Sequence, residues 1–137
     1  MRSVPSISIL LATAALVLLG TAGCDDDDVL DPRFEPEVAN NTDSFQFQAT
    51  GVNGVTQTLT YVCRNTGTQA NVDQSCALTG GTASLVLSDS TGTQLYAKSL
   101  SENGSFTSSA GQAGNWTIRV VLDDVKGTLN FRVQKST

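Results

Sequence analysis

The chain has 137 residues, carries 13 acidic against 8 basic side chains, and has a formal net charge of −5 at pH 7. It contains no histidine, which excludes Ser-His-Asp and Cys-His catalysis as well as imidazole ligation of a metal. The length allows one small domain, and the dispersed basic residues do not form the positive footprint that nucleic-acid binding requires.

The N-terminal residues have the pattern of an export signal. Arg2 is followed by a stretch without charges, whose most apolar part is residues 7–19. The small residues 21–23 then lead directly into Cys24, as at a secretory cleavage site. We therefore exclude residues 1–23 from the folded domain. An uncleaved transmembrane anchor is the alternative, since about 20 apolar residues can span a bilayer.

The sequence TAGC, residues 21–24, resembles the lipobox of bacterial lipoprotein signal peptides. In that family the cysteine receives a diacylglyceryl thioether and becomes the acylated first residue after cleavage. The match holds at Ala22, Gly23 and Cys24, whereas Thr21 stands where the family usually has leucine. The resemblance implies lipidation at Cys24, with acyl chains such as palmitate. It also implies that the exported domain is held by this lipid at the periplasmic or cell-surface face of a bacterial envelope.

Residues 24–43 are predicted to form the lipidated cysteine and an acidic, disordered tether. Residues 25–43 hold eight acids and one base, a net charge of −7, whereas residues 44–137 hold five acids and six bases, a net charge of +1. Such a self-repelling segment has too few apolar residues to offset the entropy of ordering. The four aspartates 25–28 could also be read as a calcium site, but they lack the alternating spacing and glycine of a calcium loop.

Residues 44–137 are predicted to form one all-β domain, a small antiparallel β-sandwich of about seven strands. Apolar and polar residues alternate with a period of two, which indicates half-buried strands, and Gln74 interrupts one otherwise apolar face. Turn sequences rich in glycine, asparagine and aspartate separate the strands. The predicted strands centre on residues 45–49, 59–63, 72–78, 85–87, 95–100, 116–122 and 129–133, with an optional short strand at Phe106, and the predicted turns include residues 51–54, 79–81 and 123–127.

Cys63 and Cys76 are predicted to form a disulfide. With Cys24 lipidated, an even pair remains in a compartment where disulfides persist. Both cysteines have the inward parity of their strands, and a bridge across this loop would contribute about 3 kcal/mol. A simple hairpin turning at residues 66–67 would not place them opposite each other, so the bridge requires a longer loop, a bulge or facing sheets. Two buried free thiols are the alternative.

The segment ASLVLSDSTGTQLY is followed by NGSFTSSAGQAGNWTIRVVL and then by GTLNFRV. This order, over residues 83–133, resembles the C-terminal half of bacterial extracellular β-sandwich modules of the pre-peptidase C-terminal type. The matching positions are Gly114, Trp116, Ile118 and Val120, and these positions are structural in that family. Such modules accompany secreted enzymes or adhere to polysaccharide, and no enzyme domain adjoins the module in this sequence.

We expect neither catalysis nor a cofactor. A glycosidase needs two carboxylates that face each other across a cleft, but Asp89, Glu102, Asp123 and Asp124 stand in or beside turn sequences. Asp123 and Asp124 could also supply part of a calcium shell, although a solvated hairpin turn is the simpler interpretation.

Two classes of function remain. The favoured one is a membrane-anchored cell-envelope lipoprotein whose non-catalytic structural or protein-interaction domain contacts an unidentified envelope protein through strand edges or loops. The alternative is a carbohydrate-binding surface module for a polysaccharide, which would use exposed rings to stack on sugars. Tyr96 and Phe106 are the two candidate rings for that role, because the other aromatic residues have core parity. No nucleic-acid partner is expected.

Overall fold

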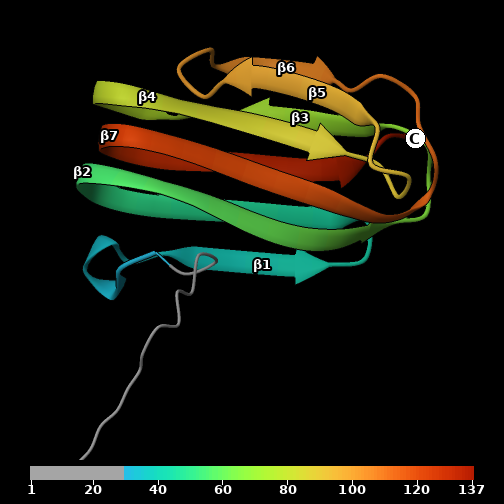
Figure 1. Cartoon of the computed structure of the whole chain (residues 1–137), viewed down its shortest axis with the longest axis horizontal. Helices are drawn as coiled ribbons and strands as arrows, with labels where there is room; N and C mark the ends of the chain where they lie inside the picture. The colour runs from blue at the N-terminus through green and yellow to red at the C-terminus, as the bar shows by residue number, and fades with distance from the viewer. Residues whose placement is uncertain (1–29) are drawn as a thin grey trace, which may run out of the picture.

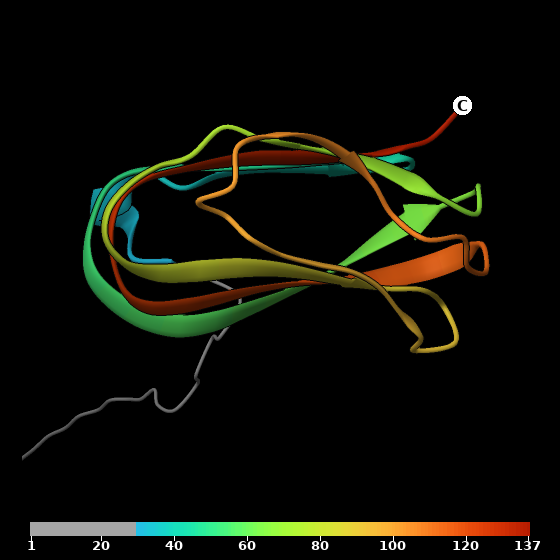
Figure 2. The same ribbon diagram turned by 90° about the horizontal axis from the view of Figure 1, so that it is seen from above.

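The computed structural model describes residues 30–137, in which one antiparallel sheet bends back on itself to form two layers (Figures 1 and 2). The predicted all-β antiparallel sandwich is confirmed, with both layers belonging to the same sheet. The described residues include no helix with the length and apolar character needed to cross a bilayer. The elements are η1 (Pro32–Phe34), β1 (Glu37–Asn41), β2 (Ser44–Asn65), β3 (Ala70–Gln74), β4 (Ala77–Ser88), β5 (Gln94–Ser99), β6 (Gly104–Thr107) and β7 (Gly114–Lys135).

The two long strands, β2 and β7, pair with each other and run through both layers. In the first layer, the start of β2 pairs with the end of β7, beginning with Ser44 opposite Gln134. In the second layer, the end of β2 pairs with the start of β7, closing with Asn65 opposite Gly114. Strands β1, β3 and β6 complete the first layer. Strand β4 starts opposite Thr128 of β7, passes through the bend and completes the second layer together with β5. Figure 2 shows the long strands turning together at one end of the molecule.

The bend lies where glycine-rich sequence interrupts the ladders of β2 and β4. The register shifts between Ala49 and Gln57 in β2, and again near Gly81 in β4. Such β-bulges add an unpaired residue and bend the strand locally. Gly51 and Gly81 adopt φ values of 62° and 73°, which glycine reaches without the steric cost of a Cβ. The sheet therefore bends at positions whose backbone conformation favours glycine over other residues.

The prediction that residues 51–54, 79–81 and 123–127 form turns between separate strands was wrong. These residues lie inside β2, β4 and β7, so two pairs of predicted strands are single bent strands. The physical reason is that hairpin turns and bulges both require residues with positive φ, so glycine and asparagine mark either one. The count of about seven strands still holds because β1 and β6 replace the two strands lost in this way.

The interior between the layers is filled by the side chains that the alternation predicted to face inward. Phe45 and Phe47 are completely buried, and Phe131 is 1% exposed. The ring of Phe131 stacks on that of Phe47 with centroids 5.3 Å apart. Tyr61 reaches across from the second layer, with its ring centroid 5.1 Å from that of Phe45. Each such aromatic pair adds about 0.5–1.5 kcal/mol beyond burial of its area, so this cluster joins the two layers.

The ordered domain begins before residue 44, which corrects the predicted boundary of the disordered tether at residue 43. Leu30 and Phe34 are 2% and 4% exposed, and β1 pairs with the start of β2. Asp31 caps η1 by accepting a bond of 2.9 Å from the backbone nitrogen of Arg33. The acidic composition of the segment did not indicate this structure. Two apolar side chains are enough to attach the segment to a core that the rest of the domain forms. The predicted signal sequence and Cys24 lie outside the described residues.

Gly81→Ala should destabilise the protein far more than Gly51→Ala, although both glycines lie in the bend. A Cβ at position 81 would clash with the carbonyl oxygens of Asp123 and Asp124, whereas nothing lies within 4 Å of a Cβ at position 51. Gly51→Ala thus carries only the strain of its positive φ, about 1 kcal/mol, and Gly81→Ala should cost at least about 3 kcal/mol. Urea denaturation of the two variants measures both costs, and equal losses would contradict the close approach.

Candidate functional site

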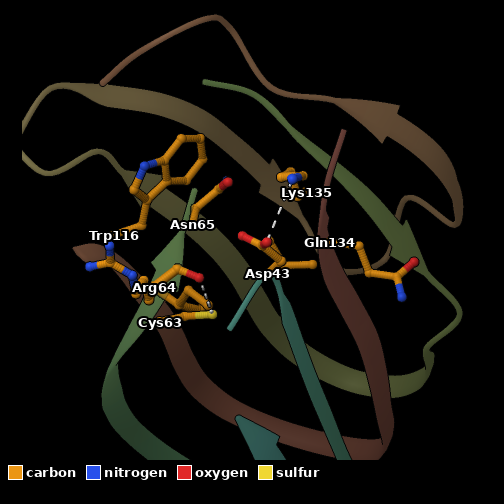
Figure 3. A pocket seen from close by; sticks show the side chains of 9 residues that line it. Asp43, Cys63, Arg64, Asn65, Trp116, Gln134 and Lys135 are labelled. Atoms are coloured by element: carbon orange, nitrogen blue, oxygen red, sulfur yellow. Dashed lines mark hydrogen bonds and ion pairs between the residues drawn. The ribbon is translucent and has the colours of Figure 1, made fainter. Parts of the chain in front are cut away.

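A small hollow lies at the end of the sandwich opposite the bend (Figure 3). The volume open to solvent is about 10 Å³, which is room for roughly one water molecule. A small-molecule site needs roughly 300–1,000 Å³, so this hollow does not take a substrate. Its lining comes from β2, both ends of β7 and the turn before β2, namely Asp43, Cys63, Arg64, Asn65, Trp116, Ile118, Val133, Gln134 and Lys135.

Asp43 holds the strand ends around this hollow together. Its carboxylate accepts bonds from the backbone nitrogen of Thr66 at 2.7 Å and from the Thr66 hydroxyl at 2.8 Å. The Lys135 Nζ lies 3.6 Å from the same carboxylate (Figure 3). The bonds from Thr66, and then the charge of Lys135, lower the pKa of Asp43 below its usual value. The carboxylate is therefore fully engaged in joining three segments of chain.

Asp89 is the carboxylate with the most complete set of hydrogen bonds, and it is only 4% exposed. Its Oδ1 accepts bonds from the hydroxyl and backbone nitrogen of Thr91, at 2.7 and 2.9 Å, and from the backbone nitrogen of Thr93 at 3.0 Å. Its Oδ2 accepts a bond of 2.9 Å from the backbone nitrogen of Gln112. These bonds, that of the Thr91 hydroxyl above all, lower the pKa of Asp89 to about 2. Asp89 thus holds two loops together through four hydrogen bonds.

The Asp89 turn also connects to the Gly-Trp segment at the start of β7. Gln112 accepts a bond of 2.8 Å from the Trp116 indole nitrogen through its carbonyl oxygen. A Cβ on Gly111 would lie 2.6 Å from Asp89 Oδ2, so only glycine allows this loop to approach the carboxylate. Gln112 therefore joins the Asp89 turn to the start of β7 through these two hydrogen bonds.

Tyr96 is buried, which corrects the expectation that its ring is exposed for glycan binding. It is 7% exposed, and its hydroxyl donates a 2.6 Å bond to Gln74 Oε1. Burial, and then the charge of Glu102, raises the pKa of Tyr96. The Gln74 amide nitrogen donates in turn to the carbonyl oxygens of Ser99 and Glu102. Gln74, the polar residue on the inward face of β3, needs a hydrogen-bond donor inside the domain, and the Tyr96 hydroxyl supplies it. This need is a sequence signal from which the burial of Tyr96 could have been predicted.

Phe106 is half-buried rather than presented to solvent. The Nζ of Lys98 lies 4.5 Å from the centroid of its ring, a cation–π contact that covers one face. Neither candidate ring therefore offers a bare platform for a sugar.

The predicted disulfide between Cys63 and Cys76 is absent, and both residues are buried free thiols. Cys63 stands opposite Trp116 in the second layer. The Cys76 Sγ lies in the other half of the sheet, where it accepts a 3.2 Å bond from the backbone nitrogen of Asn130. The alternation of apolar and polar residues predicted correctly that both cysteine side chains face inward. It does not determine how far apart two inward-facing residues lie along a bent sheet. Burial raises the pKa of both thiols, which disfavours the reactive thiolate.

Asp123 and Asp124 are exposed at the bend of β7 rather than in a hairpin turn. The backbone nitrogen of Asp124 donates a 3.0 Å bond to the hydroxyl of Thr56 in β2. Across residues 30–137, no group of three or more His, Cys, Asp or Glu side chains is placed to hold a metal ion. The structure thus brings no third acidic ligand to this pair.

The larger hollows lie on the first layer, along β1 and β2 and across β3 and β7. One has a volume of about 200 Å³ and the other about 170 Å³, and they share Gln46. All five residues of β1 are exposed, including Val38 at 43%. The first hollow is lined by Glu37, Val38, Ala39, Gln46 and Gln48, and the second by Gln46, Asp73, Ser75, Asn130 and Arg132. This polar surface lies beside β1, all of whose residues are exposed.

No protein-family model matches the chain, and no curated protein matches it. Two solved structures are similar to it at a low level. The Glycosylation Associate Protein (Gap123) complex from Streptococcus agalactiae has 10% identity and a TM-score of 0.40, over 83% of this chain and 43% of that one. The accessory secretory protein 1, 2 and 3 structure from Streptococcus pneumoniae has 9% identity and a TM-score of 0.38, over 76% and 87%. The chain spans less than half the length of the first, and neither likeness bears on its function.

Replacing Asp89 by asparagine should lower the melting temperature by roughly 5 °C or more at neutral pH, because the backbone nitrogens of Thr91, Thr93 and Gln112 lose a charged acceptor. The pKa of Asp89 is depressed to about 2 in the fold, so its stabilisation is complete above the unfolded value near 4 and disappears as the pH falls toward 2. Melting curves of wild type and Asp89→Asn should therefore converge in acid. Asp123→Asn, at an exposed position, is the control; a constant gap between wild type and Asp89→Asn at all pH values would contradict this assignment.

Proposed function

We propose that this protein is a cell-envelope lipoprotein, anchored through Cys24, whose β-domain is non-catalytic and binds a protein partner. The TAGC sequence at residues 21–24 supports the anchor. Multiple acyl chains on one cysteine would hold the domain stably at a membrane, since each buried methylene contributes about 0.8 kcal/mol.

The state of the carboxylates favours binding over catalysis. Asp43 and Asp89 are ionised and committed to backbone and hydroxyl donors. A general acid or base needs a pKa near the working pH and a free path to a substrate proton. The hollow beside Asp43 admits about one water molecule. These residues therefore support the architecture of the domain and not a reaction.

The exposed edge of β1 is the observation that carries the protein-binding proposal. In the described sheet β1 pairs only with β2, and all its residues are exposed. A partner strand can add to such an edge through main-chain hydrogen bonds. The hollow of about 200 Å³ beside Ala39 offers room for a partner side chain. Pro36 and Glu37 limit the usable edge at its start, which favours a short, defined contact over open-ended aggregation.

Glycan binding is less well supported by the same surface. Stacking on sugar faces requires exposed rings, but Tyr96 is buried and Phe106 is half-buried beneath Lys98. Within residues 30–137 the large hydrophobic side chains that are exposed are Val38 and Val62, neither of which is aromatic. A protein contact at the β1 edge is therefore the better reading of this geometry.

A photo-crosslinking amino acid at Ala39 should capture a protein of discrete mass in intact cells. The matched control is the same amino acid at Thr58, which is exposed on β2 in the other layer. We expect adducts from position 39 and none from position 58, resolved by gel mobility and peptide mass spectrometry. Equal labelling at both positions, or none at position 39, would refute the β1 contact, and glycosidase-sensitive adducts would favour a polysaccharide instead.

Cys24→Ser should abolish incorporation of a labelled fatty acid and move the protein out of the membrane fraction. Cys63→Ser and Cys76→Ser are the controls, because these thiols are buried in the domain and should leave lipidation unchanged. Radiolabelling with fractionation tests the anchor independently of any partner. A wild-type protein that carries no acyl group would rule it out.

A further inference from the structure

The chain contains two Asn-Gly dipeptides, Asn53-Gly54 and Asn103-Gly104, and the fold treats their side chains differently. Asparagine followed by glycine is chemically labile, because a glycine nitrogen is not shielded by a neighbouring Cβ and can approach the asparagine side chain. Whether the reaction proceeds in a folded protein then depends on how firmly the amide and the following nitrogen are held.

Asn103 is clamped at both ends of its amide. Its Oδ1 accepts a 2.8 Å bond from the backbone nitrogen of Cys76, and its Nδ2 donates a 2.9 Å bond to the carbonyl oxygen of the same residue. Attack on the Asn103 Cγ requires the side chain to rotate, which breaks both bonds. It would also leave backbone groups beside a buried cysteine without their partners. The clamp therefore protects this dipeptide.

Asn53 has no such restraint. It is exposed in the bend of β2, and within residues 30–137 no hydrogen-bond partner holds its amide. Gly54 has φ 69° and falls in the register shift between Asn53 and Val55, so no residue of β7 stands opposite it. The nitrogen that would react thus belongs to a residue outside the regular pairing of the ladder.

We infer that Asn53 is a site of spontaneous deamidation in the folded protein, while Asn103 is protected. The Gly54 nitrogen loses its proton to solvent and attacks the Asn53 Cγ, forming a C–N bond. The bond from Cγ to the amide nitrogen breaks as that nitrogen takes up a proton from solvent, so that ammonia departs and a succinimide ring remains. Water then opens either carbonyl of the ring, which gives aspartate or isoaspartate at position 53.

Either product changes the bend. Aspartate places a new negative charge opposite Lys126, the residue paired with Asn53 across the ladder. Isoaspartate routes the backbone through the former side chain and adds a carbon to β2 where the sheet folds. Accumulation of isoaspartate is therefore expected to lower the stability of the domain.

The test is peptide mass spectrometry of the full-length protein held at physiological temperature and mildly alkaline pH, in heavy-oxygen water. Cleavage after Arg33 and Arg64 releases the peptide with Asn53, and cleavage after Lys98 and Arg119 releases the peptide with Asn103. Fragment ions locate each change. We expect deamidation at Asn103 to be roughly tenfold slower or more, because two hydrogen bonds must break first.

Concentrated urea supplies the matched control, since it removes the clamp without altering the sequence. In urea the two sites should react at similar rates, and Asn53→Gln should abolish the change at position 53 under both conditions. Native-state rates that are equal at the two sites would overturn the inference. The inference would also be overturned if Asn53 stayed intact in the native protein over the time in which both sites react in the unfolded chain.

Discussion

The continuous pairing of β2 with β7 through the bend is the constraint on which the rest of the molecule depends. Because the same two strands cross both layers, the separation and register of the layers are set by one hydrogen-bonded ladder. The aromatic cluster forms as a consequence, since the bend brings Tyr61 over Phe45 from the same strand. Strands β1, β3 and β4 pair directly with these two strands, and β5 and β6 pair with β4 and β3. A bend that failed would leave two half-sheets, each with one apolar face open to water.

This architecture engages the carboxylates of two loops in internal hydrogen bonds and leaves one strand edge exposed. The two carboxylates with depressed pKa values, Asp43 and Asp89, tie loops together at the end opposite the bend. The hollow there is the size of a water molecule. What remains open is the side of the sandwich at β1, where backbone groups and a shallow polar surface meet solvent. The proposed contact of a partner strand with β1 would use the groups that this distribution leaves open.

Sequence reasoning predicted the face of a residue much better than its position. The inward residues Phe45, Phe47, Leu59, Trp116 and Phe131 are all buried, because a period of two is the same in a straight strand and in a bent one. The bend itself could not be distinguished from hairpin turns, since positive φ is common to both. The disulfide prediction was wrong because the alternation of side chains gives the face on which each cysteine lies and not the distance between the two cysteines. Strand β1 was not predicted, because the acidic composition of residues 25–43 favoured disorder despite the apolar Leu30 and Phe34. The burial of Tyr96 was not predicted, because it follows from the hydrogen bond that the buried Gln74 side chain needs.

Nuclear Overhauser contacts along β7 distinguish a bent strand pair from two hairpins. We expect backbone contacts from Leu122 to Gln57 and from Gly127 to Val52, which lie on either side of the bend in one strand pair. We expect no cross-strand contacts between residues 122 and 128. Observing contacts between those two residues would show a hairpin turn at residues 123–127 and would contradict a sheet that folds through continuous strands.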